Sequence, residues 1–384
     1  MIILIISPGL VEVPPIRIIG GIPEIDYQIG IQISAYYKTI ITSPFYYKYQ
    51  RYKKINKNLK ILYIYHPAIN RTAKVNVFIL FLETLSILLF YNFQIIINII
   101  KLKKHGLNLV ILSERYSGTI QIMICKLLKI KTIFSEGNSY PWYSPFSTKR
   151  PSAISWGVNL SFGKLACKLT DKIRAQSTLI KRGMINYGIP KDKIEIITGG
   201  VDTNTFRPYN YIETDYVIGF LGRLTEEKGA SLLYDIVKAC EKELPKAKFI
   251  VGGSGPYEIM LKNLKNVIFQ QTVPRNILPI FINKASVFIS TYYDFSLSDL
   301  EILSCGKPLI KINTPEMNEL FKNYEEVIFC NRNVKDFVEK IKLLYENKDL
   351  CKKLGENARK KVEKEFDWKV IGKQWVELIN SLLK

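Results

Sequence analysis

Short apolar runs alternate with longer segments of helical periodicity along the whole chain of 384 residues. This alternation is typical of βα units, in which helices connect parallel strands. Twelve runs have the length and composition of strands: Ile2–Ile6, Leu59–Tyr65, Leu107–Leu112, Lys131–Phe134, Lys172–Ala175, Lys193–Ile197, Val217–Leu221, Ala247–Val251, Val267–Gln270, Val287–Ser290, Pro308–Ile312 and Val327–Phe329. The pattern predicts an α/β protein with two sheets, and the chain length suits two domains.

The strand and helix pattern is interrupted near Arg207-Pro208, where proline and polar residues replace the apolar runs. Such a break favours a domain boundary. We therefore expect a first domain over residues 1–207 and a second over 208–366.

Basic residues are concentrated in the first half of the chain. Residues 1–200 contain 27 Lys and Arg against 9 Asp and Glu, a net charge of +18, whereas residues 201–384 contain 28 against 25, a net charge of +3. Positive surface selects anionic lipid, nucleic acid or acidic ligands. The two halves are therefore expected to bind different partners.

Two segments of the first half suit the surface of an anionic membrane. Segment 75–100 contains a single charge, Glu83, and is bracketed by basic residues: Arg71, Lys74, Lys101, Lys103 and Lys104. Segment 36–54 interleaves seven aromatic with five basic residues. Apolar insertion combined with attraction to anionic lipid is the usual design of peripheral attachment.

Other interpretations of these two segments stay open. Segment 75–100 also suits an unusually apolar core helix, or two helices, while Glu83 argues against a membrane span. Interleaved rings and bases can also bind single-stranded nucleic acid. Because no RNP, KH or zinc-knuckle motif accompanies them, we expect no nucleic-acid partner.

Cysteine and histidine are arranged in a way that argues against a metal centre. The six cysteines form no C-x-x-C pair, and the chain has two histidines, His66 and His105. We expect buried thiols in a reducing cytoplasm and no bound metal. The apolar start of the chain has no basic n-region or cleavage site, and is expected to be a buried strand rather than a signal peptide.

A pattern suited to anion binding begins the second half. Val217–Gly229 consists of an apolar strand, Gly222, Arg223, a short loop, and Lys228 at the start of a helix. This order brings two cations and a helix N-terminus beyond the carboxyl end of a strand, where α/β sheets bind anions. A diphosphate suits this chemistry.

A second segment with polar chemistry is Leu300–Ile310, which is expected to form a helix that ends at Gly306 and leads into a strand. Glu301, near the predicted start of this helix, is placed to accept hydrogen bonds from ribose hydroxyls. The alternative role of Glu301 is stabilisation of the helix start by the dipole.

Taken together, these segments resemble the retaining glycosyltransferases of the family 4 type, which have the GT-B architecture of two Rossmann-like domains facing across a cleft. The motifs occur in order along most of the chain: Pro14-Pro15, Gly20-Gly21-Ile22, Gln176-Ser177, Gly199–Pro208, Gly222-Arg223 with Lys228-Gly229, Gly252–Pro256, and Glu301 with Cys305–Pro308. It is their order and spacing together that identify the family.

The resemblance implies a site for a sugar-nucleotide donor. Arg223 and Lys228, beside Gly222, would neutralise the diphosphate, and Glu301 would hold the ribose. Gly20 and Gly21 would let the backbone of the first domain approach the phosphates, although a tight turn alone also explains two glycines. The last segment, 367–384, resembles the family's terminal helix, which crosses back onto the first domain.

The sequence departs from the family pattern at two positions that concern catalysis. Family members commonly have a second Glu eight positions before the ribose-binding Glu, but Tyr293 stands there, and Asp294 beside it is the candidate replacement. Family members often have a His in the first domain where this chain has Glu136. Glu136 is a candidate to orient the acceptor or stabilise an oxocarbenium ion, or else belongs to a surface loop. His66 is a weaker candidate.

The resemblance therefore implies retaining transfer of a sugar from a nucleoside diphosphate sugar to a lipid-linked or glycan acceptor. It implies no cofactor, because cationic side chains replace a metal ion. With the basic first half, it predicts a cytoplasmic protein held peripherally at the inner face of the cell membrane. The alternative is a catalytically inactive relative that binds a sugar nucleotide or glycan, as the missing Glu allows.

Overall fold

The computed structural model describes residues 1–7, 21–45, 52–65, 91–143, 153–209 and 215–383. These residues form two compact units. The first contains Met1–Tyr143, Pro151–Thr198 and Ile371–Lys384, and the second contains Gly199–Val370.

The first unit is built on a sheet with the strand order β3-β4-β2-β1-β5-β6-β7-β8. All neighbouring strands are parallel except the edge pair β3 and β4. The strands are β1 (Ile2–Ile6), β2 (Lys38–Phe45), β3 (Tyr52–Lys54), β4 (Leu59–Tyr65), β5 (Leu107–Leu112), β6 (Lys131–Glu136), β7 (Lys172–Ala175) and β8 (Ile194–Ile196).

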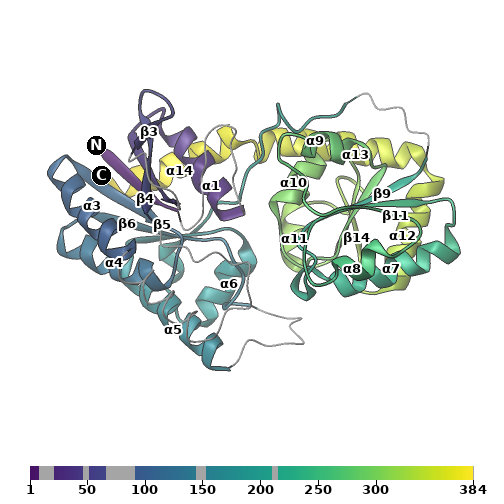
Figure 1. Ribbon diagram of the computed structural model, residues 1–384, viewed down its shortest axis with the longest axis horizontal. Coiled ribbons are helices and arrows are strands. Elements are labelled where there is room, and N and C mark those ends of the chain that lie inside the picture. The colour runs from purple at the N-terminus through teal and green to yellow at the C-terminus, as the bar shows by residue number, and fades with distance from the viewer. Residues whose placement is uncertain (8–20, 46–51, 66–90, 144–152, 210–214, 384) are drawn as a thin grey trace. The chain divides into compact units, whose positions relative to one another are not determined.

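Helices cover both faces of this first sheet (Figure 1). They are α1 (Gly21–Ile33), α3 (Asn92–Lys104), α4 (Tyr116–Leu127), α5 (Ala153–Leu169), α6 (Thr178–Asn186) and α14 (Trp368–Leu383). Side chains alternate between the faces of a strand, so both faces of these parallel strands are apolar. Leu4 and Ile6 of β1 pack in one cluster with Ile95 of α3 and Cys125 of α4.

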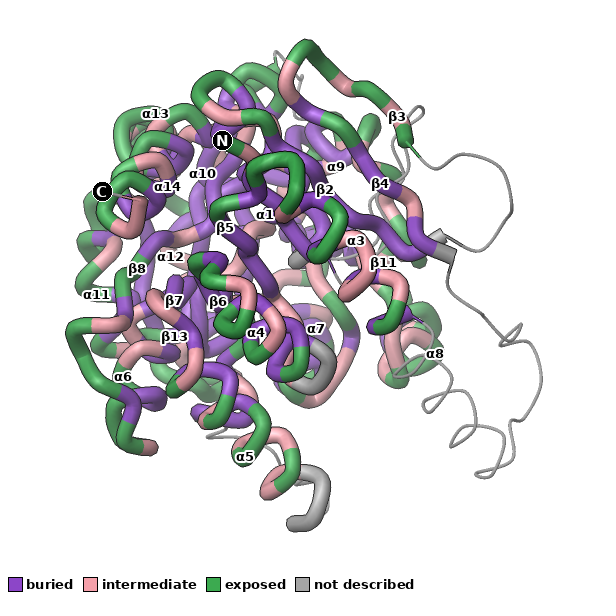
Figure 2. The backbone as a smooth tube through the Cα atoms, turned by 90° about the vertical axis from the view of Figure 1, so that its left-hand side faces the viewer, coloured by how far each residue is buried: buried purple, intermediate pink, exposed green. Residues whose placement is uncertain are grey.

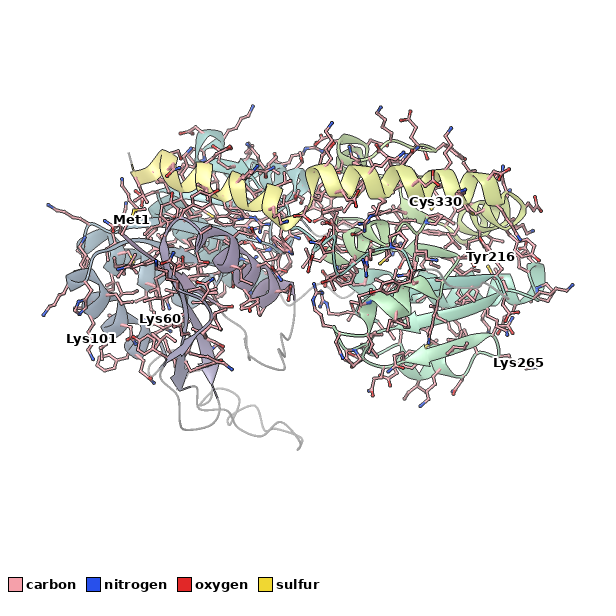
Figure 3. The ribbon with its side chains drawn as sticks, turned by 90° about the horizontal axis from the view of Figure 1, so that it is seen from above. Met1, Lys60, Lys101, Tyr216, Lys265 and Cys330 are labelled. Atoms are coloured by element: carbon pink, nitrogen blue, oxygen red, sulfur yellow. The ribbon has the colours of Figure 1, made fainter. Side chains whose placement is uncertain are left out.

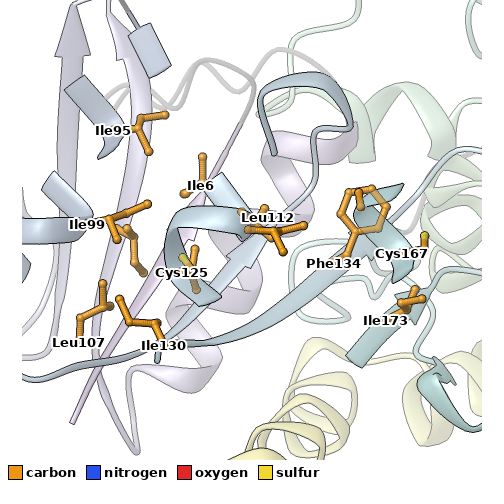
Figure 4. Close-up of a cluster of buried hydrophobic side chains, with 14 of the residues drawn as sticks. Ile6, Ile95, Ile99, Leu107, Leu112, Cys125, Ile130, Phe134, Cys167 and Ile173 are labelled. Carbon is orange, nitrogen blue, oxygen red and sulfur yellow. The ribbon is translucent and has the colours of Figure 1, made fainter. Parts of the chain in front are cut away.

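The central strands of the first unit are buried along most of their length (Figure 2). Met1 and Lys60 belong to this unit, whereas Cys330 lies in the second (Figure 3). The core under α3 and α4 is formed by Ile, Leu and Cys side chains, with Phe134 of β6 beside Cys167 of α5 (Figure 4).

Strand β2 removes residues 39–44 from the membrane surface expected over segment 36–54. Residues 38–45 form an inner strand between β1 and β4, and Ile41, Thr42 and Ser43 are fully buried. Their backbone groups are paired with β1 and β4, as burial of an inner strand requires. The aromatic residues at 46, 47 and 49 lie outside the described residues.

The predicted segment 75–100 is described only in its last part. Residues 75–90, including Glu83, lie outside the described residues, and α3 begins at Asn92. Helix α3 is packed against the sheet through Ile95, Ile99 and Leu102. No helix among the described residues is both long and apolar enough to cross a membrane.

The second unit has a fully parallel sheet with the strand order β11-β10-β9-β12-β13-β14. Counted from β9, this is the order 3-2-1-4-5-6 of a doubly wound dinucleotide-binding fold. The strands are β9 (Val217–Leu221), β10 (Lys248–Gly252), β11 (Val267–Gln270), β12 (Val287–Ser290), β13 (Leu309–Ile312) and β14 (Ile328–Cys330).

Two core clusters lie on opposite faces of this second sheet. One joins α7 and α12 to the sheet, and the other joins α9 and α10 to it (Figure 1). The helices are α7 (Ala230–Glu243), α8 (Glu258–Lys262), α9 (Leu278–Asn283), α10 (Leu297–Ser304), α11 (Pro315–Leu320), α12 (Val334–Glu346) and α13 (Lys348–Glu365). Both sheets of the predicted α/β fold are thus present.

The chain passes between the units at Thr198 and again within α14. Val201 exchanges backbone hydrogen bonds with Phe366 and Trp368, and buried Phe206 packs in the core of the second unit. Residues 199–207 therefore lie in the second unit, earlier than the boundary expected after Arg207. From Ile371 onward, α14 belongs to the first unit.

Helix α14 packs closely against α1. A Cβ added at Gly372 would lie 2.5 Å from Cβ of Gln32, so glycine permits this approach. Tyr37 Oη donates a hydrogen bond of 2.6 Å to Oδ1 of Asn380 farther along α14. These contacts place the last helix on the first unit.

Candidate functional site

The topology of the second sheet brings two loops together. Strands β9 and β12 are neighbours, but their connections leave the sheet in opposite directions, which makes this the topological switch point. In open α/β sheets, ligands bind beyond the carboxyl ends of the strands at this point. The loop after β9 contains Gly222 and Arg223, and the loop after β12 contains Tyr292, Tyr293 and Asp294.

Lys228 lies directly at this switch point. Its Nζ is 3.2 Å from the centroid of the Tyr292 ring, a cation–π contact between the two loops. The following residue, Gly229, has φ of 72°, and a Cβ there would lie 2.6 Å from the Thr291 carbonyl oxygen. Thr291 Oγ1 donates a hydrogen bond of 2.6 Å to the Lys228 carbonyl. The backbone at Lys228 is therefore fixed against β12.

The ammonium of Lys228 is in an environment that favours its neutral form. Burial lowers its pKa to about 8, and the charge of Glu227 opposes this shift while that of Arg223 adds to it. An anion bound beside Lys228 would raise this pKa again, because it stabilises the charged form. A group of this kind gains more from an anionic ligand than a fully solvated lysine does.

Arg223 presents its guanidinium to solvent at the same place. Its side chain is 62% exposed, and Nη2 lies 3.2 Å from Oε2 of Glu227. An exposed pair at this spacing contributes at most about 1 kcal/mol to stability. Arg223 is therefore of little importance for folding, and its guanidinium can exchange Glu227 for a ligand at low cost.

The glycine-rich turn after β10 closes against the loop after β9. Gly253 has φ of 151°, and a Cβ there would lie 1.9 Å from the Gly222 carbonyl oxygen. The Leu224 amide donates a hydrogen bond of 2.9 Å to the Ser254 carbonyl. A Cβ at Gly222 itself would meet only the Phe220 ring, at 3.7 Å. Sterically, glycine is therefore required at 253 and not at 222.

A buried lysine outside the sequence motifs holds the loop after β12. Lys311 of β13 donates to Oδ2 of Asp299 at 2.9 Å, to Oγ of Ser290 at 3.2 Å, and to the carbonyls of Tyr292 and Asp294 at 3.1 and 2.9 Å. Both charged side chains are almost fully buried. Lys311 therefore fixes the shape of the loop that carries Tyr292.

Glu301 lies farther inside its helix than expected. Helix α10 begins at Leu297, with a capping box between Ser296 and Asp299, so the expectation that Glu301 is near the helix start is wrong. Asp299 is the residue that stabilises the start. The Glu301 carboxylate is buried and accepts a hydrogen bond of 2.5 Å from Nη1 of Arg275. Arg275 is a second residue missed in the sequence.

Asp294 and Tyr293 are both buried in the loop after β12. The Tyr293 ring packs 4.8 Å from that of Tyr292, so an aromatic pair fills the place of the family's first Glu. Asp294 Oδ1 accepts a hydrogen bond of 2.8 Å from the Phe295 amide. The role of Asp294 in holding the donor sugar stays a prediction.

Glu136 is the last residue of β6 and is held by several donors. Arg115 donates from Nε and Nη2 to Oε2, at 2.9 and 2.7 Å, and Trp142 Nε1 donates to the same atom at 2.9 Å. The Asn138 amide donates to Oε1 at 3.0 Å. Glu136 thus organises the segment after β6, and its catalytic role stays a prediction.

The switch point of the first sheet, between β1 and β5, holds a buried carboxyl group. Asp26 of α1 accepts a hydrogen bond of 3.2 Å from Ser113 Oγ, just after β5. Burial raises the pKa of Asp26 to about 7, while Ser7, Ser113 and the charge of Arg174 act in the opposite direction. Gly21 opens the same helix; Gly20 and His66 lie outside the described residues.

Metal ligands do not gather anywhere in the described part of the chain: no three His, Cys, Asp or Glu side chains lie close enough together to hold an ion. Five of the six cysteines are buried, and burial raises the pKa of Cys125, Cys240 and Cys305 to about 12.

Comparison with known proteins adds a family and a fold. Residues 202–361 match the family described as Glycosyl transferases group 1. An uncharacterized glycosyltransferase of Methanocaldococcus jannaschii, MJ1178, is 27% identical over 216 residues, which cover 54% of this chain and 58% of that protein. The match thus spans less than two thirds of that relative.

A Campylobacter jejuni N,N'-diacetylbacillosaminyl-diphospho-undecaprenol alpha-1,3-N-acetylgalactosaminyltransferase is 23% identical over 304 residues, which cover 74% of this chain and 79% of that enzyme. Among solved structures, Anabaena HepE in complex with UDP and glucose superposes with a TM-score of 0.74 at 15% identity, covering 99% of both chains. The two-sheet α/β fold of the GT-B type is thereby confirmed.

Proposed function

Residues 202–361 match the glycosyl transferases group 1, and from that premise we propose that this chain is a glycosyltransferase that moves a sugar from a nucleoside diphosphate sugar to a lipid-linked or glycan acceptor with retention of configuration. The observation that supports this proposal best is the pair of cations, Arg223 and Lys228, at the switch point of the second sheet. HepE, which shares the fold, was solved with UDP-glucose.

The proposed mechanism is one of charge stabilisation. As the bond between sugar and diphosphate breaks, negative charge grows on the leaving phosphate. Arg223 and Lys228 stabilise this charge, and the leaving phosphate accepts the proton of the attacking acceptor hydroxyl on the same face of the sugar. A positioned donor of this kind contributes about 10²- to 10³-fold to the rate. The reaction needs no metal ion, since the cations take its place.

Glu301 is proposed to bind the ribose hydroxyls through its carboxylate. Arg275 donates to Oε1 of the same carboxylate, so its guanidinium lies beside the group that would receive the hydroxyls. Glu136 and Asp294 are the proposed carboxylates on the acceptor and donor-sugar sides. Gly20, Gly21 and Gly222 are proposed to let the backbone come close to the phosphates.

A lipid-linked acceptor is proposed because the Campylobacter relative is named for a diphospho-undecaprenol acceptor. An acceptor of that kind is anchored in a bilayer, so the protein is proposed to work peripherally at the cytoplasmic face of the membrane. The excess of basic residues in the first half of the chain supports this location, since anionic lipid attracts such a surface.

The proposal is tested with a panel of labelled sugar nucleotides, by measuring donor binding, hydrolysis and transfer. We expect Arg223→Ala and Lys228→Ala to fold normally and to lose about 10²- to 10³-fold in kcat/KM. Lys265→Ala is the matched control, since this exposed lysine lies just before β11, at the amino end of that strand and so away from the carboxyl ends that carry the site. Full activity of both site variants would refute the donor-site assignment.

The second candidate function is a sugar-nucleotide-binding relative without turnover. Burial of Tyr293 at the place of the family's first Glu favours it. The same panel separates the two candidates. Donor binding that depends on Arg223 and Lys228, without hydrolysis or transfer to any acceptor, would favour the binding protein.

A further inference from the structure

We propose that the outer sides of α3, α4 and α5 form a docking surface for an anionic lipid bilayer. We call this surface the three-helix face, and it comprises Phe93, Ile100, Ile120, Met123, Leu127, Val158, Phe162 and Leu165. The inference rests on the proposed function, because a lipid-linked acceptor is presented at a bilayer. It assigns that contact to particular side chains.

Each of the three helices exposes an apolar stripe at helical spacing. In α4 the exposed residues are Ile120, Met123 and Leu127, and Leu127 is 78% exposed. In α5 they are Val158, Phe162 and Leu165. Residues spaced by three, four and seven positions lie on one side of a helix. Each stripe therefore faces one direction, away from the sheet.

The stripe of α3 has the same character. Phe93, which is 62% exposed, and Ile100 lie seven positions apart on its outer side. Helix α4 lies between α3 and α5 on one face of the first sheet and contacts both (Figure 1). The three stripes are therefore neighbours and form one apolar surface rather than scattered exposed residues.

The core of the first unit is formed by other side chains of these helices. The inner sides of the same helices already supply the core, through Ile95 and Ile99 of α3, Ile122 and Cys125 of α4, and Cys167 of α5. Monomeric soluble proteins rarely expose large contiguous apolar patches without a binding role. Helix α13 of the second unit shows the ordinary case, since all its exposed residues are charged: Lys, Glu and Asp.

The charge of the three helices identifies the occupant. Helices α3, α4 and α5 contain six lysines, Lys101, Lys103, Lys104, Lys126, Lys164 and Lys168, and no Asp or Glu. Lysine near the end of a helix is favoured by the dipole, but the dipole equally favours Asp or Glu in the first turn, and these are absent. The dipole alone does not explain this composition.

The lysines also share one edge of the three-helix face. Because the strands are parallel, the connecting helices run in the same direction, and their last turns lie at the same edge of the layer. Lys101 and Lys104 of α3, Lys126 of α4 and Lys168 of α5 are exposed there. Figure 3 shows Lys101 at the periphery of the unit. Apolar side chains beside cations suit the headgroup region of an anionic bilayer.

A second copy of this chain suits the surface poorly. Pairing of two three-helix faces would bring six lysines against six lysines with no carboxylate from these helices between them. Like charges across an interface oppose association. Anionic lipid, in contrast, supplies the opposite charge and an apolar phase together.

The test is co-sedimentation of the full chain with vesicles of phosphatidylcholine, with and without phosphatidylglycerol. We expect binding to the anionic vesicles that weakens as salt is raised. The double variants Met123→Glu/Leu127→Glu and Val158→Glu/Leu165→Glu should each lower the partition coefficient at least about tenfold, since each loses apolar contact and gains repulsion. Circular dichroism should show both to be folded, because each changed side chain is at least 42% exposed and lies outside the core.

The matched control is Ile259→Glu/Ile268→Glu. These residues are 74% and 60% exposed and lie on the second unit, so this variant should bind anionic vesicles as the unchanged chain does. Equal loss in the control and face variants, or no binding by the unchanged chain, would overturn the inference. A dimer that is abolished by the face variants would instead identify a second copy as the occupant.

Transfer to a short, water-soluble acceptor without vesicles separates this inference from the proposed function. If the face variants retain that transfer but lose vesicle binding, both proposals stand. If the chain binds vesicles through the three-helix face and transfers no sugar, the docking surface stands and the proposed function fails. If transfer occurs and the face variants bind vesicles normally, only the docking surface fails.

Discussion

Replacement of Lys311 by methionine tests whether the loop at the donor site depends on one buried charge. Methionine has a similar length and fills the same volume without donating hydrogen bonds. The change removes the ion pair with Asp299 and leaves Ser290 Oγ and the carbonyls of Tyr292 and Asp294 without their donor. Asp299, whose side chain is 3% exposed, then keeps a buried negative charge.

Breaking a buried pair by removing one partner typically costs about 3–5 kcal/mol, because the remaining charge is uncompensated. We expect Lys311→Met to fall in this range. Asp299 retains the hydrogen bond from the Ser296 amide, at 3.0 Å, which limits the loss. Lys248→Met is the control: its pair with Asp215 is about half exposed, and its removal should cost less than about 1 kcal/mol.

The cost is measured by urea unfolding, with hydrogen exchange of peptides from 287–312 to assign the change to the second unit. Adding Asp299→Asn to Lys311→Met should recover about 1–3 kcal/mol, because asparagine can still accept from the Ser296 amide but carries no charge. A cost below about 1 kcal/mol for Lys311→Met, or no recovery in the double variant, would refute the idea that this pair fixes the loop.

Two further changes test the titration of the first unit and the ribose site. Folding raises the pKa of Asp26 from 3.8 to about 7, so between these pH values the folded protein binds a proton that the unfolded chain does not. The free energy of unfolding therefore falls as pH rises from about 4 to 7. Asp26→Asn should accordingly gain about 2–3 kcal/mol more stability at pH 8 than at pH 5 in urea unfolding, and an equal gain at both would contradict it. If Arg275 positions Glu301, Arg275→Ala should raise the KM for the donor several-fold with kcat little changed. Arg275→Lys should restore part of the donor affinity. A loss confined to stability would argue for a structural role alone.

Most strands could be predicted because each is a continuous apolar run between turn residues. The bounds of β1, β4, β5, β7 and β9 agree with the sequence expectation. Strand β2 was missed because Thr39, Thr42, Ser43 and Pro44 interrupt its apolar residues, although its position inside the sheet buries them. The edge strand β3 is short and largely exposed, so hydrophobicity gave no signal for it.

The residues of the candidate site differ in how far apart their partners lie in the sequence. Arg223 and Lys228 could be predicted because both lie in one short segment, Val217–Gly229, which contains a strand, a turn and the start of a helix. Arg275 and Glu301 are separated by 26 positions, and a lone arginine in a loop gives no indication of its partner. Lys311 did leave a signal: a lysine inside the apolar strand Leu309–Ile312 of a parallel sheet must be paired, because both faces of such a strand are buried.

The three-helix face could not be predicted from hydrophobic periodicity. In α4, Ile122 and Cys125 face the core while Ile120, Met123 and Leu127 face outward, so both sides of the helix are apolar. Such a sequence indicates either a fully buried helix or one in contact with lipid. Helix α4 packs on the sheet through one side only, so the exposed apolar side can be identified only once the position of the sheet is known. The composition of the helices still distinguishes a fully buried helix from one in contact with lipid. Lysines without carboxylates are costly in a buried layer but favourable beside anionic lipid.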